Sequence, residues 1–191
     1  AIREKIIELG GEVRFSAKMT GLNVRNGKIT GVRMADGSVI PTENVILAIG
    51  HSSRDTIEQL LIDQIPMEAK PFAVGVRVEH PQDYINQIQY RGIKEKSSLD
   101  PAEYFLRYTS SAGKGVYSFC MCPGGYVVAA ASEKDTVVTN GMSYSGRNGK
   151  YANSAIVVQV SAKDTGDGIT AGMNYQRKLE REAYLLGKGK A

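Results

Sequence analysis

The chain has 191 residues, of which 42% are hydrophobic and 23% are charged, and its formal net charge is +4 at pH 7. This composition excludes a disordered chain, and the length is enough to bury a sizeable core. No Lys/Arg cluster is interleaved with aromatic residues, so we expect no nucleic-acid partner. No apolar run approaches the roughly 20 residues that span a bilayer, and no signal-peptide pattern is present. We therefore expect no membrane partner and a cytoplasmic location.

The first residues predict a short helix and then a strand. Ile2, Ile6 and Leu9 fall on one helical face, and Gly10-Gly11 ends the helix. The alternating run at 12–15 predicts a strand. Because no cap or lead-in precedes this helix, we expect the chain to be cut from a longer protein.

Two turn signals then divide an alternating region into three strands. Asn26-Gly27 and Asp36-Gly37 are dipeptides that tight hairpins favour. The strands are expected at 17–24, 28–34 and 38–40. The sequence therefore predicts a three-stranded meander.

The next stretch predicts a buried strand, a glycine turn and a helix. Val45–Ile49 is a continuous apolar run, Gly50 ends it, and a helical pattern follows at 56–61. Ser52 with Asp55 resembles a capping box. Such an arrangement places backbone N–H groups at the carboxyl edge of a sheet, where α/β proteins bind nucleotides. The alternative is a buried strand and its loop with no ligand.

The rest of the chain predicts a β-rich region with flanking helices, and not a second doubly wound sheet. The expected helices lie at 82–89 and 172–186, and the expected strands at 73–79, 103–109, 116–121, 126–131, 136–139 and 155–160. We expect 126–131 to pair back on 116–121 as a hairpin, and 142–153 to form a polar loop. The fold class is therefore expected to be α+β.

Five segments carry a resemblance to a known family, and they are Ala48–Ser52, Lys70–Arg77, Glu79–Pro81, Cys120–Gly125 and Thr139–Ser143. They are spread along the chain, and the resemblance that they carry extends over most of it. The chain resembles the two-dinucleotide-binding-domain flavoproteins, and more narrowly the bacterial FAD-dependent dehydrogenases of the uncharacterised NAD(FAD)-utilising family.

The resemblance implies two domains. Residues 1–62 would be part of an FAD-binding α/β domain, with helix, meander and buried strand, and residues 63–191 an inserted β-rich substrate domain with flanking helices. The Gly-x-Gly-x-x-Gly fingerprint that holds the FAD pyrophosphate in such proteins is absent. The chain therefore resembles an internal fragment, inactive by itself, whose parent binds FAD.

The resemblance also implies cofactor-binding residues. Gly50 would let the backbone approach FAD, with Ala48, Ile49 and His51 as neighbours, and Met19 lies where such proteins place the residue whose backbone meets the adenine. Each has a structural alternative: Gly50 ends a strand, His51 faces solvent, and Met19 packs in the meander.

Three residues are substrate candidates: Arg77, Asn140 and Arg147. Arg77 can clamp a carboxylate or phosphate through two parallel hydrogen bonds, or it can pair with Glu79 or Glu133 at the surface. Asn140 and Arg147 lie near the flavin in the family architecture, but as turn residues they need no function.

Cys120 and Cys122 are the two cysteines of the chain. On an extended strand their Cα atoms would lie about 6.5–7 Å apart, at the outer limit for a disulfide. The spacing is not Cys-x-x-Cys, and no cationic residue stands beside them in the sequence, so packed thiols are favoured over a redox couple. Two thiols are too few for a structural zinc site, so no metal is expected.

The sequence therefore predicts part of an FAD-dependent oxidoreductase that transfers a hydride between an organic substrate and the flavin. Its expected partner is a small-molecule substrate, and NAD(P)H as an electron donor or acceptor is left open. No catalytic residue emerges, because in flavin enzymes the cofactor carries the electron chemistry. The alternative is a ligand- or partner-binding module on a vestigial flavoprotein scaffold.

Overall fold

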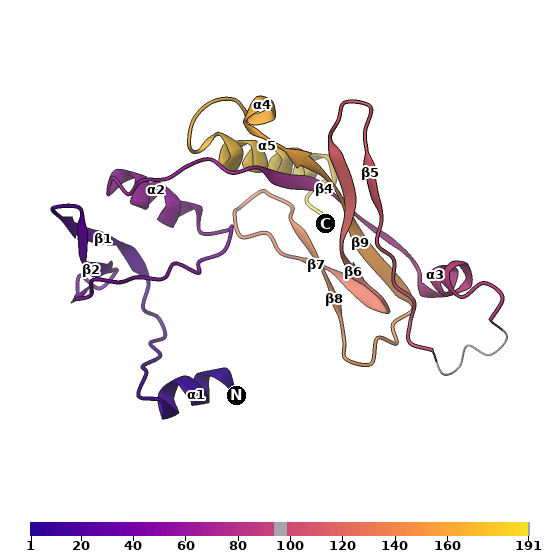
Figure 1. The fold of residues 1–191 in the computed structure, drawn as a ribbon, viewed down its shortest axis with the longest axis horizontal. Coiled ribbons are helices and arrows are strands. Elements are labelled where there is room, and N and C mark those ends of the chain that lie inside the picture. Colours follow the sequence, from indigo (N-terminus) through magenta and orange to yellow (C-terminus); the bar gives the residue numbers. More distant parts are fainter. Residues whose placement is uncertain (94–98, 191) are drawn as a thin grey trace. The chain divides into compact units, whose positions relative to one another are not determined.

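The computed structural model describes residues 1–93 and 99–190, and the chain divides into two compact units. The first unit is Ala1–Met67 and the second is Glu68–Ala191. Both units contain short helices and small antiparallel sheets, so the α+β fold class is confirmed (Figure 1).

The first unit contains the predicted meander. Strands β1 (Met19–Arg25), β2 (Lys28–Met34) and β3 (Val39–Ile40) pair antiparallel in that order. Asn26 and Gly27 have φ angles of 51° and 72°, so both adopt the left-handed conformation that a two-residue hairpin turn of type I′ requires. The meander prediction is confirmed.

The predicted helix at the start is confirmed as α1 (Ile2–Glu8), but the strand predicted at 12–15 is wrong. Arg14 instead donates hydrogen bonds to Glu12, two residues earlier, and Phe15 is 73% exposed. A strand needs a hydrogen-bonded neighbour, and the sheet of this unit consists of β1, β2 and β3 alone among the described residues.

The buried strand predicted at Val45–Ile49 is also wrong. These residues form no strand, and Ile46 is 95% exposed. The apolar run needs strands beside it and cover on both faces, and the described part of this unit supplies neither. The segment is therefore apolar and uncovered.

The helix predicted at 56–61 is confirmed as α2 (Arg54–Ile62), but its predicted capping box does not form. Ser53 is the N-cap, and its hydroxyl donates to the Ile49 carbonyl at 2.7 Å. Asp55 accepts a hydrogen bond from Lys18 at 2.7 Å instead of turning back to Ser52.

A carboxylate fastens α2 to the meander. Asp63, whose side chain is 8% exposed, accepts hydrogen bonds from Arg33 Nη2 at 2.6 Å, from the Leu22 N–H at 2.8 Å and from Gln59 Nε2 at 3.0 Å. Gly21 leaves room for this pair, because a Cβ there would lie 2.1 Å from Arg33 Nη2. Burial raises the pKa of Asp63, but these hydrogen bonds and the Arg33 charge together lower it below its usual value.

The second unit has a four-stranded sheet and a two-stranded sheet. In the larger sheet the strand order is β4-β9-β6-β5, and in the smaller one β7 pairs with β8. The bounds are β4 (Phe72–Pro81), β5 (Arg107–Thr109), β6 (Gly115–Cys122), β7 (Gly125–Ala129), β8 (Thr139–Ser143) and β9 (Tyr151–Val160). β4 pairs with β9 over its whole length, from Phe72↔Val160 to Pro81↔Tyr151.

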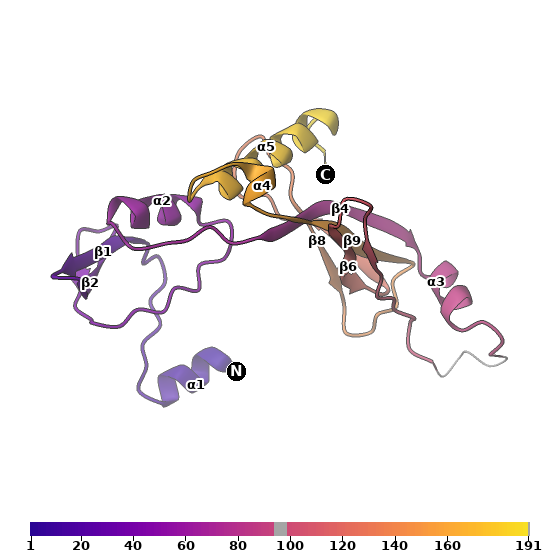
Figure 2. The same cartoon turned by 45° about the horizontal axis from the view of Figure 1, so that its top comes forward.

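The described residues of the second unit form three helices: α3 (Gln82–Gln89), α4 (Ala162–Thr165) and α5 (Ala171–Leu186). The predictions at 82–89 and 172–186 are confirmed, and α4 was not predicted. Figures 1 and 2 show α3 beyond the end of β4 and α5 near its beginning. There the rings of Phe72 and Tyr175 pack edge to face, with centroids 6.5 Å apart.

The predicted hairpin between 116–121 and 126–131 is wrong, because β6 pairs with β5 and β9 whereas β7 pairs with β8. A close backbone contact explains the change of sheet. A Cβ on Gly124 would lie 1.8 Å from the Arg147 carbonyl oxygen, and the Gly149 N–H donates to the Gly124 carbonyl at 3.1 Å. The turn after β6 therefore packs against the segment after β8.

Several predicted strand bounds also differ from the structure. The strand expected at 136–139 lies at Thr139–Ser143 instead, so Asn140-Gly141 is inside β8. β8 runs to Ser143 and β9 begins at Tyr151, so the predicted loop 142–153 is shortened at both ends. Both β8 and β9 include polar residues that are typical of turns, because these residues pair with a neighbouring strand in the sheet.

We predict that Asp63→Asn lowers the free energy of unfolding by about 1–3 kcal/mol, because a buried hydrogen-bonded acceptor loses its charge. The folded pKa of Asp63 lies below its unfolded value of about 3.9, so its contribution is present above that value and is lost as the pH falls through the folded pKa. The variant should therefore lose less stability than the wild type on acidification. Urea denaturation between neutral and acidic pH measures both effects.

The matched control is Asp55→Asn, because the Asp55–Lys18 pair is exposed on both sides. An effect of Asp63→Asn no larger than that of Asp55→Asn would contradict a structural role for Asp63.

Candidate functional site

The candidate site is a polar cluster in the second unit, where β8 approaches the larger sheet. It contains Arg77 on β4, Asn153 on β9, Cys120 and Cys122 on β6, and Gly141 on β8. In the larger sheet Asn153 pairs with Cys122 of β6 on one side and with Glu79 of β4 on the other. Glu79 lies two residues from Arg77 along β4. Opposed residues and alternate residues share one face of a sheet, so the side chains of Arg77, Asn153 and Cys122 lie on the same face.

Gly141 allows this cluster to form. A Cβ at this position would lie 2.4 Å from Arg77 Nη1, 2.4 Å from Asn153 Oδ1 and 2.7 Å from Cys122 Sγ. Real Cβ atoms do not approach other atoms so closely. β8 therefore passes over the cluster only because residue 141 has no side chain.

Arg77 and Asn153 form the centre of the cluster. Arg77 Nη1 donates to Asn153 Oδ1 at 2.7 Å and to the Cys120 carbonyl at 3.1 Å, and Asn153 is 0% exposed. Arg77 Nε and Asn153 Nδ2 are buried and have no hydrogen-bond partner among the described residues. Buried donors in folded proteins are nearly always paired, so these two are placed to receive an acceptor from a ligand or a water molecule.

A β-bulge brings the Cys120 carbonyl to Arg77. Between Phe119 and Cys122, β6 advances three residues while its partner β9 advances two, and Cys120 has a left-handed φ of 51°. Bulges bend a strand locally and are over-represented next to functional sites. The bulge leaves Cys120 exposed and Cys122 buried.

The cluster changes the pKa values of nearby groups. Burial raises the pKa of Cys122, interaction with Cys120 raises it further, and Arg77 opposes both effects without cancelling them. Burial likewise raises the pKa of Tyr104, against a hydrogen bond with Ser154 and the charge of Arg77. The cluster is therefore a poorly solvated environment with one cation.

The three predicted substrate residues are not brought together. Arg77 lies in the cluster and hydrogen-bonds Asn153, not Glu79 or Glu133. Asn140 is exposed, and since it neighbours Gly141 on β8 its side chain points to the opposite face of that strand. Arg147 is exposed and pairs with Glu103 at 2.5 Å.

Sequence reasoning missed Asn153 altogether. It placed Asn153 at the end of a loop, whereas the structure has it fully buried inside β9. A signal was present: Asn153 and Ser154 directly precede the apolar run of the last strand, and polar residues that enter a sheet core need partners.

The predicted cofactor residues of the first unit are mostly exposed. Met19 is partly buried at the start of β1, whereas Ala48, Ile49, Gly50 and His51 are all exposed. Gly50 has a φ of 70° and nothing within 4 Å of its Cβ position, so its backbone is open to a close approach. Gly10, Gly27 and Gly37 are equally open, so openness alone does not distinguish Gly50 as a cofactor contact.

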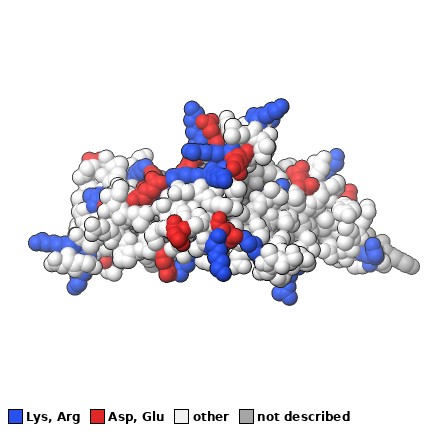
Figure 3. All heavy atoms as spheres, turned by 90° about the horizontal axis from the view of Figure 1, so that it is seen from above, with Lys and Arg blue, Asp and Glu red and all other residues white. Residues whose placement is uncertain are grey.

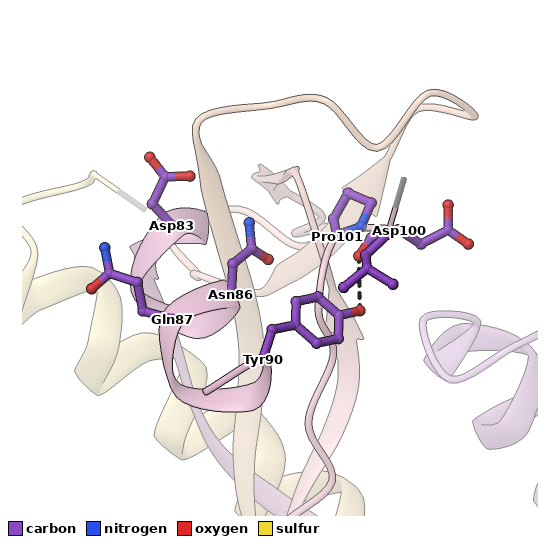
Figure 4. A pocket seen from close by; sticks show the side chains of 7 residues that line it. Asp83, Asn86, Gln87, Tyr90, Asp100 and Pro101 are labelled. Carbon is purple, nitrogen blue, oxygen red and sulfur yellow. Dashed lines mark hydrogen bonds between the residues drawn. The ribbon is translucent and has the colours of Figure 1, made fainter. Parts of the chain in front are cut away.

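A second candidate is a cavity of about 390 Å³ beside α3, lined by Asp83, Asn86, Gln87, Tyr90, Leu99, Asp100 and Pro101 (Figure 4). Its polar groups serve the structure. The Tyr90 hydroxyl donates to the Asp100 carbonyl at 2.9 Å, and Asn86 Oδ1 accepts from the Ala102 N–H at 2.9 Å. These bonds tie the segment at 100–102 to α3, which leaves the Arg77 cluster as the stronger site.

Neither the charges on the face shown in Figure 3 nor the metal-ligating groups of the described residues point to another site. On the face shown in Figure 3, Lys and Arg are interspersed with Asp and Glu. The described residues include no group of three or more His, Cys, Asp or Glu side chains that could hold a metal ion. No helix in residues 1–93 and 99–190 is long and apolar enough to cross a membrane.

Comparisons with known proteins point to a flavin-related family. Residues 71–191 match the family model described as "FAD-dependent protein, C-terminal domain-like". A protein of Clostridium beijerinckii described as uncharacterized is 50% identical over 190 residues, which are 98% of this chain and 36% of that protein. Prolycopene isomerase, chloroplastic, of Daucus carota is 32% identical over 74 residues, 38% of this chain and 12% of that protein. The chain thus spans about a third of the length of the first relative.

We predict that Gly141→Ala lowers the free energy of unfolding by about 1–3 kcal/mol, because the methyl group would overlap Arg77 Nη1 and Asn153 Oδ1. Urea denaturation measures the change. Gly146→Ala is the matched control, since the nearest atom to its Cβ position is 3.5 Å away. Equal effects of the two substitutions would mean that β8 does not pack against the cluster as described.

Proposed function

Because the chain belongs to the family of FAD-dependent proteins, C-terminal domain-like, we propose that the whole protein is an FAD-dependent oxidoreductase. Bound FAD would supply the electron chemistry, by exchanging a hydride with an organic substrate. We assign substrate binding to the second unit and one edge of the FAD site to the first. In this proposal the 191-residue chain is inactive by itself.

The observation that carries the proposal is the pair of unused donors in the Arg77 cluster. Arg77 Nε and Asn153 Nδ2 are buried, and no described residue accepts from them. Oxygens of a substrate carbonyl or carboxylate are acceptors of the kind that these donors need. The low solvation around them, apparent in the raised pKa values of Cys122 and Tyr104, would strengthen each hydrogen bond to such an oxygen.

FAD binding is tested by absorbance scans of the full-length protein and of the 191-residue chain, each after addition of FAD and removal of the excess. We expect flavin absorbance in the full-length protein alone. A full-length protein that remains colourless would overturn the proposal and favour a ligand- or partner-binding module on a vestigial flavoprotein scaffold.

We predict that Gly50→Ala in the full-length protein lowers FAD retention. A methyl group at residue 50 would occupy the open space through which the proposed FAD approaches the backbone. The control is Gly37→Ala, where φ is 85° and the Cβ position is equally open. Both substitutions strain a left-handed residue by about 1–2 kcal/mol, so strain alone affects them alike. Equal retention in the two variants would remove Gly50 from the cofactor site.

We predict that acetate, as a carboxylate probe, perturbs the NMR signals of Asn153 and of Arg77 in the 191-residue chain. Arg77→Lys should weaken acetate binding on the order of tenfold, because Lys has no Nε–H donor and no planar fork. Arg107→Lys, at an exposed position on β5, is the control. Shifts that chloride reproduces at the same ionic strength would count against a carboxylate site.

A further inference from the structure

Cys120 and Cys122 have a geometry that a straight strand would not give them. They flank Met121 at the bulge of β6, where Cys120 has a left-handed φ of 51°. Cys122 Sγ lies 3.4 Å from the Cys120 carbonyl oxygen, and the two thiols are close enough for Cys120 to raise the pKa of Cys122. The limit of about 6.5–7 Å between their Cα atoms applies to an extended segment, so it does not exclude a disulfide here.

The two thiols differ in access to solvent. Cys120 is exposed, whereas Cys122 is buried with 7% of its surface accessible. An exposed thiol next to a buried one has the arrangement of an attacking and a resolving cysteine. A small reagent can reach the first sulfur and is kept from the second.

A cation stands beside the pair, contrary to the expectation from the sequence. Arg77 is 43 residues from Cys120, yet its Nη1 donates to the Cys120 carbonyl at 3.1 Å, and its charge lowers the pKa of Cys122 against burial. Antiparallel pairing of β4 and β6 with β9 brings the guanidinium there. The cation therefore favours the thiolate of Cys122, which is the form that attacks the mixed disulfide in the second step of an exchange.

From this geometry we propose that Cys120 and Cys122 form a thiol–disulfide exchange site that reacts with small, water-soluble disulfides. The Cys120 thiolate attacks one sulfur of the reagent RSSR, which forms a mixed disulfide and releases one RS⁻. Cys122, after losing its proton, attacks Cys120 Sγ and releases the second RS⁻. In total the dithiol gives up two electrons and two protons to form one protein disulfide, and RSSR is reduced to two RSH.

The order of the two steps follows from burial. Cys120 is exposed to the reagent, whereas Cys122 is buried and its pKa is raised by burial and by Cys120, so its thiolate forms less readily than that of a free thiol. The second step therefore accelerates as the pH rises toward the pKa of Cys122. Gly141 leaves the Cys122 sulfur free of a side chain from β8, since any Cβ there would lie 2.7 Å from Sγ.

The site is tested on the reduced 191-residue chain with oxidised glutathione as the probe. The chain has two cysteines, so thiol titration and intact mass give a complete account. We expect the loss of both thiols and of two hydrogen masses from the monomer, with recovery after dithiothreitol. Chains that keep both thiols, retain glutathione or join into covalent dimers would overturn the proposal.

Two variants test the assigned roles. Cys122→Ser should stop at the mixed disulfide and gain one glutathione, whereas Cys120→Ser should react far more slowly, because its remaining thiol is buried. The reverse pattern would overturn the order of attack. The measurement on the wild type needs neither variant to fold and needs no FAD, so its outcome is independent of the proposed oxidoreductase function.

Discussion

The hydrogen bond between Arg77 and Asn153 is the interaction on which the second unit depends most. β9 lies between β4 and β6, and Asn153 is the point at which all three strands and β8 come together. Loss of Arg77 would leave the fully buried Asn153 Oδ1 without this donor, at a cost of about 1–3 kcal/mol, whereas loss of Asn153 would leave Arg77 Nη1 with the Cys120 carbonyl as its acceptor. The same bond aligns the guanidinium with the bulge, so one contact serves both the sheet packing and the chemistry of the cluster.

Local sequence signals predicted local structure well. The Asn26-Gly27 turn and the helix at 172–186 depend on neighbours in the chain, and both were found. Val45–Ile49 failed because burial of a strand depends on other strands, which the described part of its unit does not provide. The predicted hairpin between 116–121 and 126–131 failed for a related reason: a contact between Gly124 and Arg147 turns the chain away from β6, and no local pattern encodes that contact.

The candidate site was predictable only in part. Arg77 was found as a cation on the strand face opposite three valines, but its partner Asn153 is 76 residues away and was missed. The prediction for the cysteines assumed that their strand is extended and that no cation lies beside them. Neither assumption holds, because β6 has a bulge at these residues and Arg77 of β4 reaches the Cys120 carbonyl. Both features depend on how the strands pair in the folded sheet.

The uncovered apolar segment at Val45–Ile49 has a practical consequence for producing this chain. Short, uncharged, β-branched stretches without proline or glycine are the segments that stack into intermolecular sheets. The flanking Glu43 and Arg54 carry the nearest charges and stand outside the run, so they oppose such stacking only at its margins. A charge placed within the run, at Ile46 where the side chain is 95% exposed, would oppose such stacking directly.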